Sequence, residues 1–270
     1  MYLAIMLRVW RVLRTAAPNV AAGAGAGADW PVACAVLLHG LVLSWSVFGE
    51  GVPHFGFAQA LSSVLWLTIL ILWVEGFFVP MRGLQPLVLP LAGLCALLPA
   101  FFPGVAVPLG GHSTPSVLLR AHLLVALLAY SLLTIAALNA LLMTALDRQL
   151  HQAMLGRASF LQPLFRHAPP LLVMEAQLFR LIKLGFALLT VTVITGLFFS
   201  EQVYGKPLRF DHKTVFALAA WVVFGALVLG RSFLGWRGRM ALRWTLAGFA
   251  LLLLAYVGAH FVLEVILHRV

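Results

Sequence analysis

"RAHLLVALLAYSLLTIAALNALL", residues 120–142, is an apolar run with one charged side chain at its start and one histidine two residues later. A helix needs about 20 mostly apolar residues to cross the hydrocarbon core of a bilayer. The run is long enough for that, so it is predicted to be a transmembrane helix.

The composition of the whole chain indicates the same class of protein. Its 270 residues are 63% hydrophobic and 10% charged, with a mean hydropathy of +1.03. A soluble domain has roughly 45–50% apolar and about 25% charged residues. So few charges cannot cover a water-facing surface, so lipid must cover most of it. The predicted fold is an all-α, polytopic transmembrane helix bundle.

The hydropathy pattern predicts about seven full spans in one domain, residues 31–270. The predicted spans are 31–48, 56–75, 84–102, 117–145, 178–200, 214–231 and 241–264. Residues 1–30 form a separate N-terminal segment, in which Arg8, Arg11 and Arg14 interrupt a short apolar run before a Gly/Ala linker. This segment is predicted to be either a basic amphipathic helix at the membrane surface or the remnant of a first span.

The distribution of basic residues predicts how the protein is oriented across the membrane. Arginines are concentrated in segment 1–18, in the connection that holds Arg82, and in segments 147–177 and 232–243. With seven alternating spans these regions share one side, which the positive-inside rule makes cytoplasmic. The N-terminus is then cytoplasmic and the C-terminus outside, in a bacterial inner (plasma) membrane. This distribution, rather than nucleic-acid binding, explains the net charge of +10.

One outer connection departs from that rule. It holds Lys206, Arg209 and Lys213, which are only partly offset by Glu201 and Asp211. Positive charge on the outer side indicates an anionic partner there.

Three histidines lie within predicted spans: His39 near the middle of the first, and His122 and His260 near the outer ends of the fourth and last. Ionisable residues inside a membrane usually face the bundle interior or a cavity. Neutral imidazole is a good ligand for haem iron, and two helices can each present one to opposite faces of the porphyrin. The structural alternative is that each imidazole simply bonds to a neighbouring helix.

A family resemblance appears in the last two spans. "FDHKTVFALAAWVVFGALVLGR" (210–231) followed by "GWRGRMALRWTLAGFALLLLAYVG" (235–258) resembles the C-terminal part of the cytochrome c assembly family of membrane proteins. That family includes haem-handling proteins of c-type cytochrome maturation and HemX-like proteins. The chain looks closest to the smaller, YpjD-like inner-membrane branch, and the resemblance covers about residues 31–268.

The resemblance carries specific residues over to this chain. Asp211, Lys213 and Trp221 match an outer motif of the haem-handling members. His122 falls on the helix that carries an outer axial histidine, and "LLHGLVLSW" (37–45) with His39 resembles an early helix of the smaller branch. The tryptophans that precede the motif aspartate in the family are replaced by Leu208, Arg209 and Phe210.

The resemblance implies a non-enzymatic membrane protein that binds haem, or assists haem handling, at the outer face of the membrane. The expected cofactor is haem b, with His122 and His39 on the iron. The other expected site residues are His260, Arg120, Asp211, Lys213 and Trp221. The expected partners are haem, membrane lipid and other cytochrome c maturation proteins.

Two other functions stay open on the sequence. One is a membrane scaffold without a cofactor, which the lost motif tryptophans favour. The other is an ion or solute transporter, although eight acidic residues in the chain are few for a dedicated cation path. Hydrolase signatures such as HExxH, GxSxG or a Walker motif are absent.

Overall fold

The computed structural model describes residues 1–15, 30–49, 54–77, 84–106, 117–153, 169–204 and 212–258. These residues form eight α-helices. They are α1 (Tyr2–Thr15), α3 (Trp30–Phe48), α4 (Phe57–Glu75), α5 (Gln85–Phe101), α6 (Val117–Ala153), α8 (Leu171–Tyr204), α9 (His212–Phe233) and α10 (Gly238–Leu253), which continues into a π-helical turn, Leu254–Gly258. Two short strands, β1 (His54–Phe55) and β2 (Val105–Ala106), pair antiparallel. The predicted helical bundle is confirmed.

Each predicted span corresponds to a helix. Six helices of the described residues are long and apolar enough to cross a membrane, and α5, with 17 residues, is a shorter apolar helix. The sequence underestimated the lengths of two helices. α6 continues to Ala153, and α8 begins as early as Leu171. Hydropathy marks only the part of a helix that lipid surrounds, whereas these helices continue through polar residues at one end.

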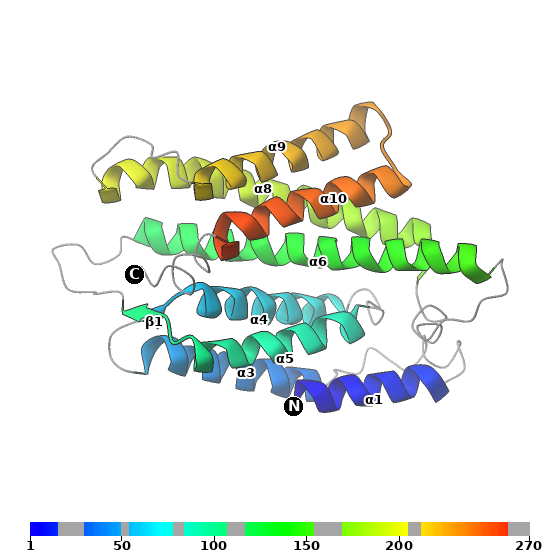
Figure 1. Cartoon of the computed structure of the whole chain (residues 1–270), viewed down its shortest axis with the longest axis horizontal. Coiled ribbons are helices and arrows are strands. Elements are labelled where there is room, and N and C mark those ends of the chain that lie inside the picture. Colours follow the sequence, from blue (N-terminus) through cyan, green and yellow to red (C-terminus); the bar gives the residue numbers. More distant parts are fainter. Residues whose placement is uncertain are drawn as a thin grey trace.

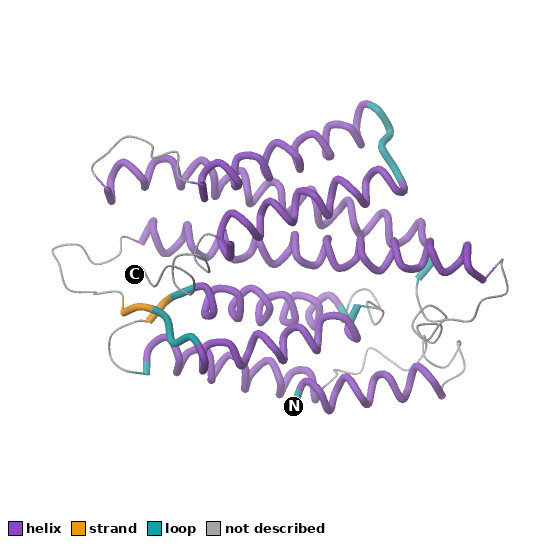
Figure 2. Tube along the Cα trace, in the orientation of Figure 1, coloured by secondary structure: helices purple, strands orange, loops and turns teal. Residues whose placement is uncertain are grey.

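The helices lie side by side along one axis, and from α3 to α10 each runs antiparallel to the one before (Figures 1 and 2). The bundle therefore has two ends. We call the end with β1 and β2, where α4, α6 and α9 begin, the strand end. The opposite end, where α4, α6 and α9 finish and α10 begins, is called the basic end after its arginines.

The bundle consists of two groups of four helices. The N-terminal half contains α1, α3, α4 and α5, and the C-terminal half contains α6, α8, α9 and α10 (Figure 1). The most extensive contact between the halves is α4 against α6. There the Ser131 hydroxyl of α6 lies 3.2 Å from the backbone oxygen of Val64. Arg180 of α8 also pairs with Glu75 of α4. The α4–α6 seam thus holds the two halves together.

Helix α1 packs lengthwise on α5 and also touches α3. Tyr2 and Ile5 are buried in the core, whereas Arg8 and Arg11 are exposed. Leu3 is 63% exposed as well, so the exposed side of α1 is not purely basic. The two predicted placements of the N-terminal segment, as an amphipathic helix at the membrane surface or as the remnant of a first span, stay predictions.

A glycine lets two helices of the C-terminal half pack closely. A Cβ atom added at Gly185 of α8 would lie 2.8 Å from Cγ and Cδ2 of Leu133 on α6. Helices in membranes pack closely where a small residue exposes the backbone, since the attraction between them comes mainly from van der Waals contact. The α6–α8 pair, the most extensively packed in the bundle, depends on this gap.

Candidate cofactor site

His122 lies on α6 near the strand end and is half-buried. Its Nδ1 is 2.7 Å from Oγ1 of Thr195 on α8. The next residue of α8 is Gly196, where an added Cβ would lie 3.4 Å from Cε1 of the imidazole. The ring of His122 therefore contacts α8 twice, with Nδ1 at the hydroxyl of Thr195 and Cε1 facing Gly196, which has no side chain.

The hydrogen bonds of Thr195 favour one tautomer of His122. Thr195 Oγ1 lies 2.7 Å from the backbone oxygen of Val191 and 3.2 Å from that of Thr192. A hydroxyl has one proton, and a carbonyl oxygen can only accept it. When the Thr195 hydroxyl donates its proton to one of these carbonyl oxygens, its own oxygen can accept a hydrogen bond from Nδ1–H of His122. The lone pair then resides on Nε2, one of the two ring nitrogens through which neutral imidazole binds metals.

A cation and two tyrosines lie at the same end of the bundle. The Nζ atom of Lys213, in the first turn of α9, is 4.9 Å from the ring centre of Tyr256 in the π-helical turn. Tyr256 in turn packs edge-on against Tyr130 of α6, whose hydroxyl donates to the backbone oxygen of Leu252 at 3.3 Å. Lys213 is also within electrostatic reach of His122. Two of the predicted site residues, His122 and Lys213, thus lie at the same end of the bundle, in the first two turns of α6 and α9.

Arg120 does not share the face of His122. Residues two apart on an α-helix are about 200° apart around its axis and do not face each other. Arg120 is exposed on α6, so its guanidinium starts from a different side of the helix. Its predicted role beside a cofactor stays a prediction.

Trp221 joins two helices. It is half-buried, its Nε1 donates to Oγ1 of Thr190 on α8 at 2.9 Å, and its ring stacks on Phe186 with centroids 5.9 Å apart. These contacts fix α9 against α8 and so help position Lys213 near His122. The predicted site residues Asp211 and His260 lie outside the described residues.

His39 has a different environment from His122. It is buried on α3, with Nδ1 3.0 Å from the hydroxyl of Tyr2 and Nε2 2.9 Å from Oγ of Ser62. It therefore bonds to α1 and α4, whereas His122 bonds to α8 in the other half. Both ring nitrogens of His39 are occupied, so iron ligation would require breaking one of these bonds. Its assignment as an iron ligand stays a prediction.

Sequence reasoning did not identify the partners of either histidine. Thr195 and Ser62 are hydroxyl residues in apolar runs, a type that usually bonds within its own helix. Thr195 is 73 residues from His122, and Ser62 is 23 from His39. The only signal in the sequence is the need of a buried polar group for a partner, and this does not say which helix supplies it.

The acidic side chains that the structure describes at the basic end are paired with arginine. Glu75 pairs with Arg180, Glu175 with Arg231 at 2.8 Å, and Asp147 with Arg239 at 2.8 Å. No group of three or more His, Cys, Asp or Glu side chains that could hold a metal ion occurs in the described part of the chain. These carboxylates therefore act as links between helices.

Known proteins resemble this chain over most of its length. The family model described as cytochrome C assembly protein matches residues 32–267. An uncharacterized 28.8 kDa protein in the nifR3-like 5′ region of Azospirillum brasilense is 32% identical over 212 residues, which is 77% of this chain and 76% of that protein. No solved structure matches.

Two relatives have more informative names. Inner membrane protein YpjD of Escherichia coli (strain K12) is 36% identical over 155 residues, which is 57% of this chain and 55% of YpjD. Cytochrome c biogenesis protein CcsA of Synechococcus elongatus is 33% identical over 109 residues, 39% of this chain and 34% of CcsA. The chain thus spans about half the length of YpjD and a third of that of CcsA.

The resemblance to the cytochrome c assembly family and its YpjD-like branch is confirmed. The family match begins in α3 and includes every later described helix. Six of the helices in this bundle are long and apolar enough to cross a membrane. The match therefore covers the membrane domain as a whole, and this multi-pass membrane protein belongs to the cytochrome c assembly protein family.

Proposed function

We propose that the protein binds a haem, haem b, at the strand end of the C-terminal half and has an accessory, non-catalytic role in cytochrome c maturation. The supporting observation is the contact of His122 with Thr195, close to the ammonium of Lys213. The family membership and the name of the relative CcsA support the biological context.

The residues present fit a haem. A metal-binding histidine usually donates its second ring nitrogen to an acceptor, which fixes the ring and its tautomer; Thr195 can provide this for His122. The ammonium of Lys213 is suited to a propionate, and the aromatic rings of Tyr130 and Tyr256 to the apolar porphyrin. A bound haem supplies iron redox chemistry, while the protein binds and orients it.

The proposal includes an orientation. At the basic end, exposed arginines include Arg148, Arg237, Arg239 and Arg243. The positive-inside rule places this end in the cytoplasm. The strand end and its haem would then face the outside of the membrane. The name of the relative, inner membrane protein YpjD, supports a bacterial inner membrane.

Replacing His122 by alanine tests the proposal. The detergent-purified protein is titrated with hemin, and the Soret absorption band gives the affinity and the ligand state. We expect the H122A variant to bind hemin more than tenfold more weakly, because loss of an outer-shell partner alone costs about 10–100-fold in metal affinity. The matched control is H151A, which removes an exposed histidine at the basic end. A wild-type protein that binds no hemin, or an unchanged H122A spectrum, would contradict the proposal.

Replacing Thr195 by valine tests how His122 is oriented. Valine keeps the shape of threonine but cannot accept from Nδ1–H. We expect hemin affinity to fall about 10–100-fold, with a change in the reduction potential of the bound iron. The control is T192V on the same helix, whose hydroxyl bonds only to the backbone oxygen of Leu188. If both variants behave alike, Thr195 does not position the histidine.

A further inference from the structure

The turn between α9 and α10, residues 234–237, has a fixed shape. The backbone N–H of Trp236 donates to the oxygen of Gly230 at 3.1 Å, and Arg231 donates to the oxygen of Trp236 at 3.2 Å. The indole of Trp236 lies directly on Gly230, where an added Cβ would be 2.4 Å from the ring, and its centroid is 5.1 Å from that of Trp244. The backbone that carries the arginines at the start of α10 is therefore held in one conformation.

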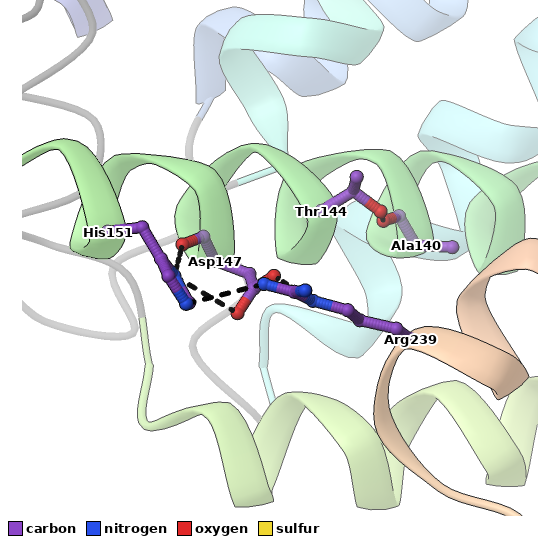
Figure 3. Close-up of polar contacts among 5 residues, drawn as sticks. All are labelled: Ala140, Thr144, Asp147, His151 and Arg239. Atoms are coloured by element: carbon purple, nitrogen blue, oxygen red, sulfur yellow. Dashed lines mark hydrogen bonds and ion pairs between the residues drawn. The ribbon is translucent and has the colours of Figure 1, made fainter.

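Two arginines near this turn are neutralised. Arg231 donates to Glu175 at 2.8 Å. Arg239, in the first turn of α10, reaches α6, where it donates to Asp147 at 2.8 Å and lies 3.4 Å from Nε2 of His151 (Figure 3). These two guanidinium groups hold neighbouring helices together.

Two further arginines have no such partner. Arg237 and Arg243 are exposed, and neither forms an ion pair with any residue that the structure describes. Arg237 immediately precedes α10 and Arg243 lies in its second turn, about 9 Å further along the helix axis and on a different side of the helix. Two positive charges without an ion-pair partner among the described residues therefore lie close to the start of α10, at the basic end.

Large apolar side chains surround these charges. Phe233 is 81% and Leu234 71% exposed. The candidate membrane spans end at Phe233 and begin again at Gly238, so the turn lies at the level of the membrane surface. The Trp236–Trp244 pair is the aromatic type that prefers this level. A ligand at this turn would contact cationic groups, aromatic rings and apolar surface together. A small soluble anion could contact only the cationic groups.

We propose that the α9–α10 turn is a binding site for an acidic phospholipid. Arg237 and Arg243 bind the phosphate headgroup, and the acyl chains lie along Phe233 and Leu234. Basic residues at a membrane surface attract anionic lipids, and a site preorganised on a rigid turn loses less entropy when it binds. The site is independent of the haem proposal, which concerns the opposite end of the bundle.

The test compares lipids bound to the purified full-length protein by native mass spectrometry, with phosphatidylglycerol and phosphatidylcholine at equal concentration. The wild type should retain phosphatidylglycerol preferentially. In the R237Q/R243Q variant the preference should fall by about 30-fold, since each basic residue near an anionic surface contributes roughly fivefold. Millimolar inorganic phosphate should not displace the lipid.

The control variant R8Q/R148Q removes the same charge from two other exposed arginines. Its preference for phosphatidylglycerol should stay close to that of the wild type. An equal loss in both variants would show that only net charge matters and would overturn the proposal. Displacement by inorganic phosphate would overturn it as well, because the site would then bind free anions. The R237K/R243K variant, which keeps the charge, should retain most of the preference and shows that the turn is intact.

Discussion

Substituting valine for Gly185 lowers the free energy of unfolding by about 3 kcal/mol, at the upper end of the usual range for an overpacked core. The Cβ atom alone would lie 2.8 Å from Cγ and Cδ2 of Leu133, and valine adds two methyl groups. α6 and α8 must separate to accept it, which weakens the most extensive helix contact in the bundle. The measurement is a denaturant titration of helical circular dichroism in mixed micelles.

Two variants distinguish this clash from a general effect of valine in α8. L184V changes the neighbouring residue, which is 53% exposed, and should alter stability by less than about 0.5 kcal/mol. The second variant combines G185V with L133A, which removes the atoms that clash. Because the two residues are in contact, the double variant should be more stable than the sum of the single effects indicates. Strictly additive effects would show that Leu133 is not the obstacle.

Replacing His39 by alanine should destabilise the protein by roughly 2–4 kcal/mol, a typical cost for a cavity in a packed core. The imidazole is 4% exposed and links Tyr2 of α1 to Ser62 of α4. Without it, the hydroxyl of Tyr2 on α1 keeps only one hydrogen bond among the described residues, the longer one of 3.3 Å to the backbone oxygen of Ala35. Hydrogen exchange within residues 2–15 should therefore rise more than exchange in α6 or α8.

The same variant decides the role of His39 towards haem. S44A serves as the control, because Ser44 is exposed on the same helix and donates only to the backbone oxygen of Leu41. If His39 only links helices, folded H39A protein should bind hemin with the same affinity as the wild type. A folded H39A variant that loses the Soret band as completely as H122A would instead make His39 the second iron ligand.

The sequence predicted the helices well because the lipid environment imposes a simple rule on them. A segment of about 20 apolar residues must satisfy its own backbone to cross the bilayer, and all seven predicted spans correspond to helices. The lengths of α6 and α8 were not predicted because their ends leave the apolar segment. Local hydropathy contains no information on how far a helix continues beyond lipid.

The candidate site was only partly predictable. The imidazole of His122 and the charge of Lys213 were recognisable as unusual residues for their positions. Their neighbours Thr195 and Tyr256 depend on how α8 and the π-helical turn pack on α6 and α9. Likewise, the sequence placed His39 at a suitable depth but could not show that Tyr2 and Ser62 occupy both of its nitrogens. Such pairings arise from tertiary packing alone.

The division into two groups of four helices bears on how the protein is made. Translation delivers α1 to α5 before α6 exists, and these helices already contact one another through α1–α5, α3–α4 and α4–α5. Domains usually fold as units, beginning with the N-terminal one during synthesis. The first four helices can thus assemble while the remainder is still being translated. The exposed side of α4 then provides the surface against which α6, the first helix of the C-terminal half, packs.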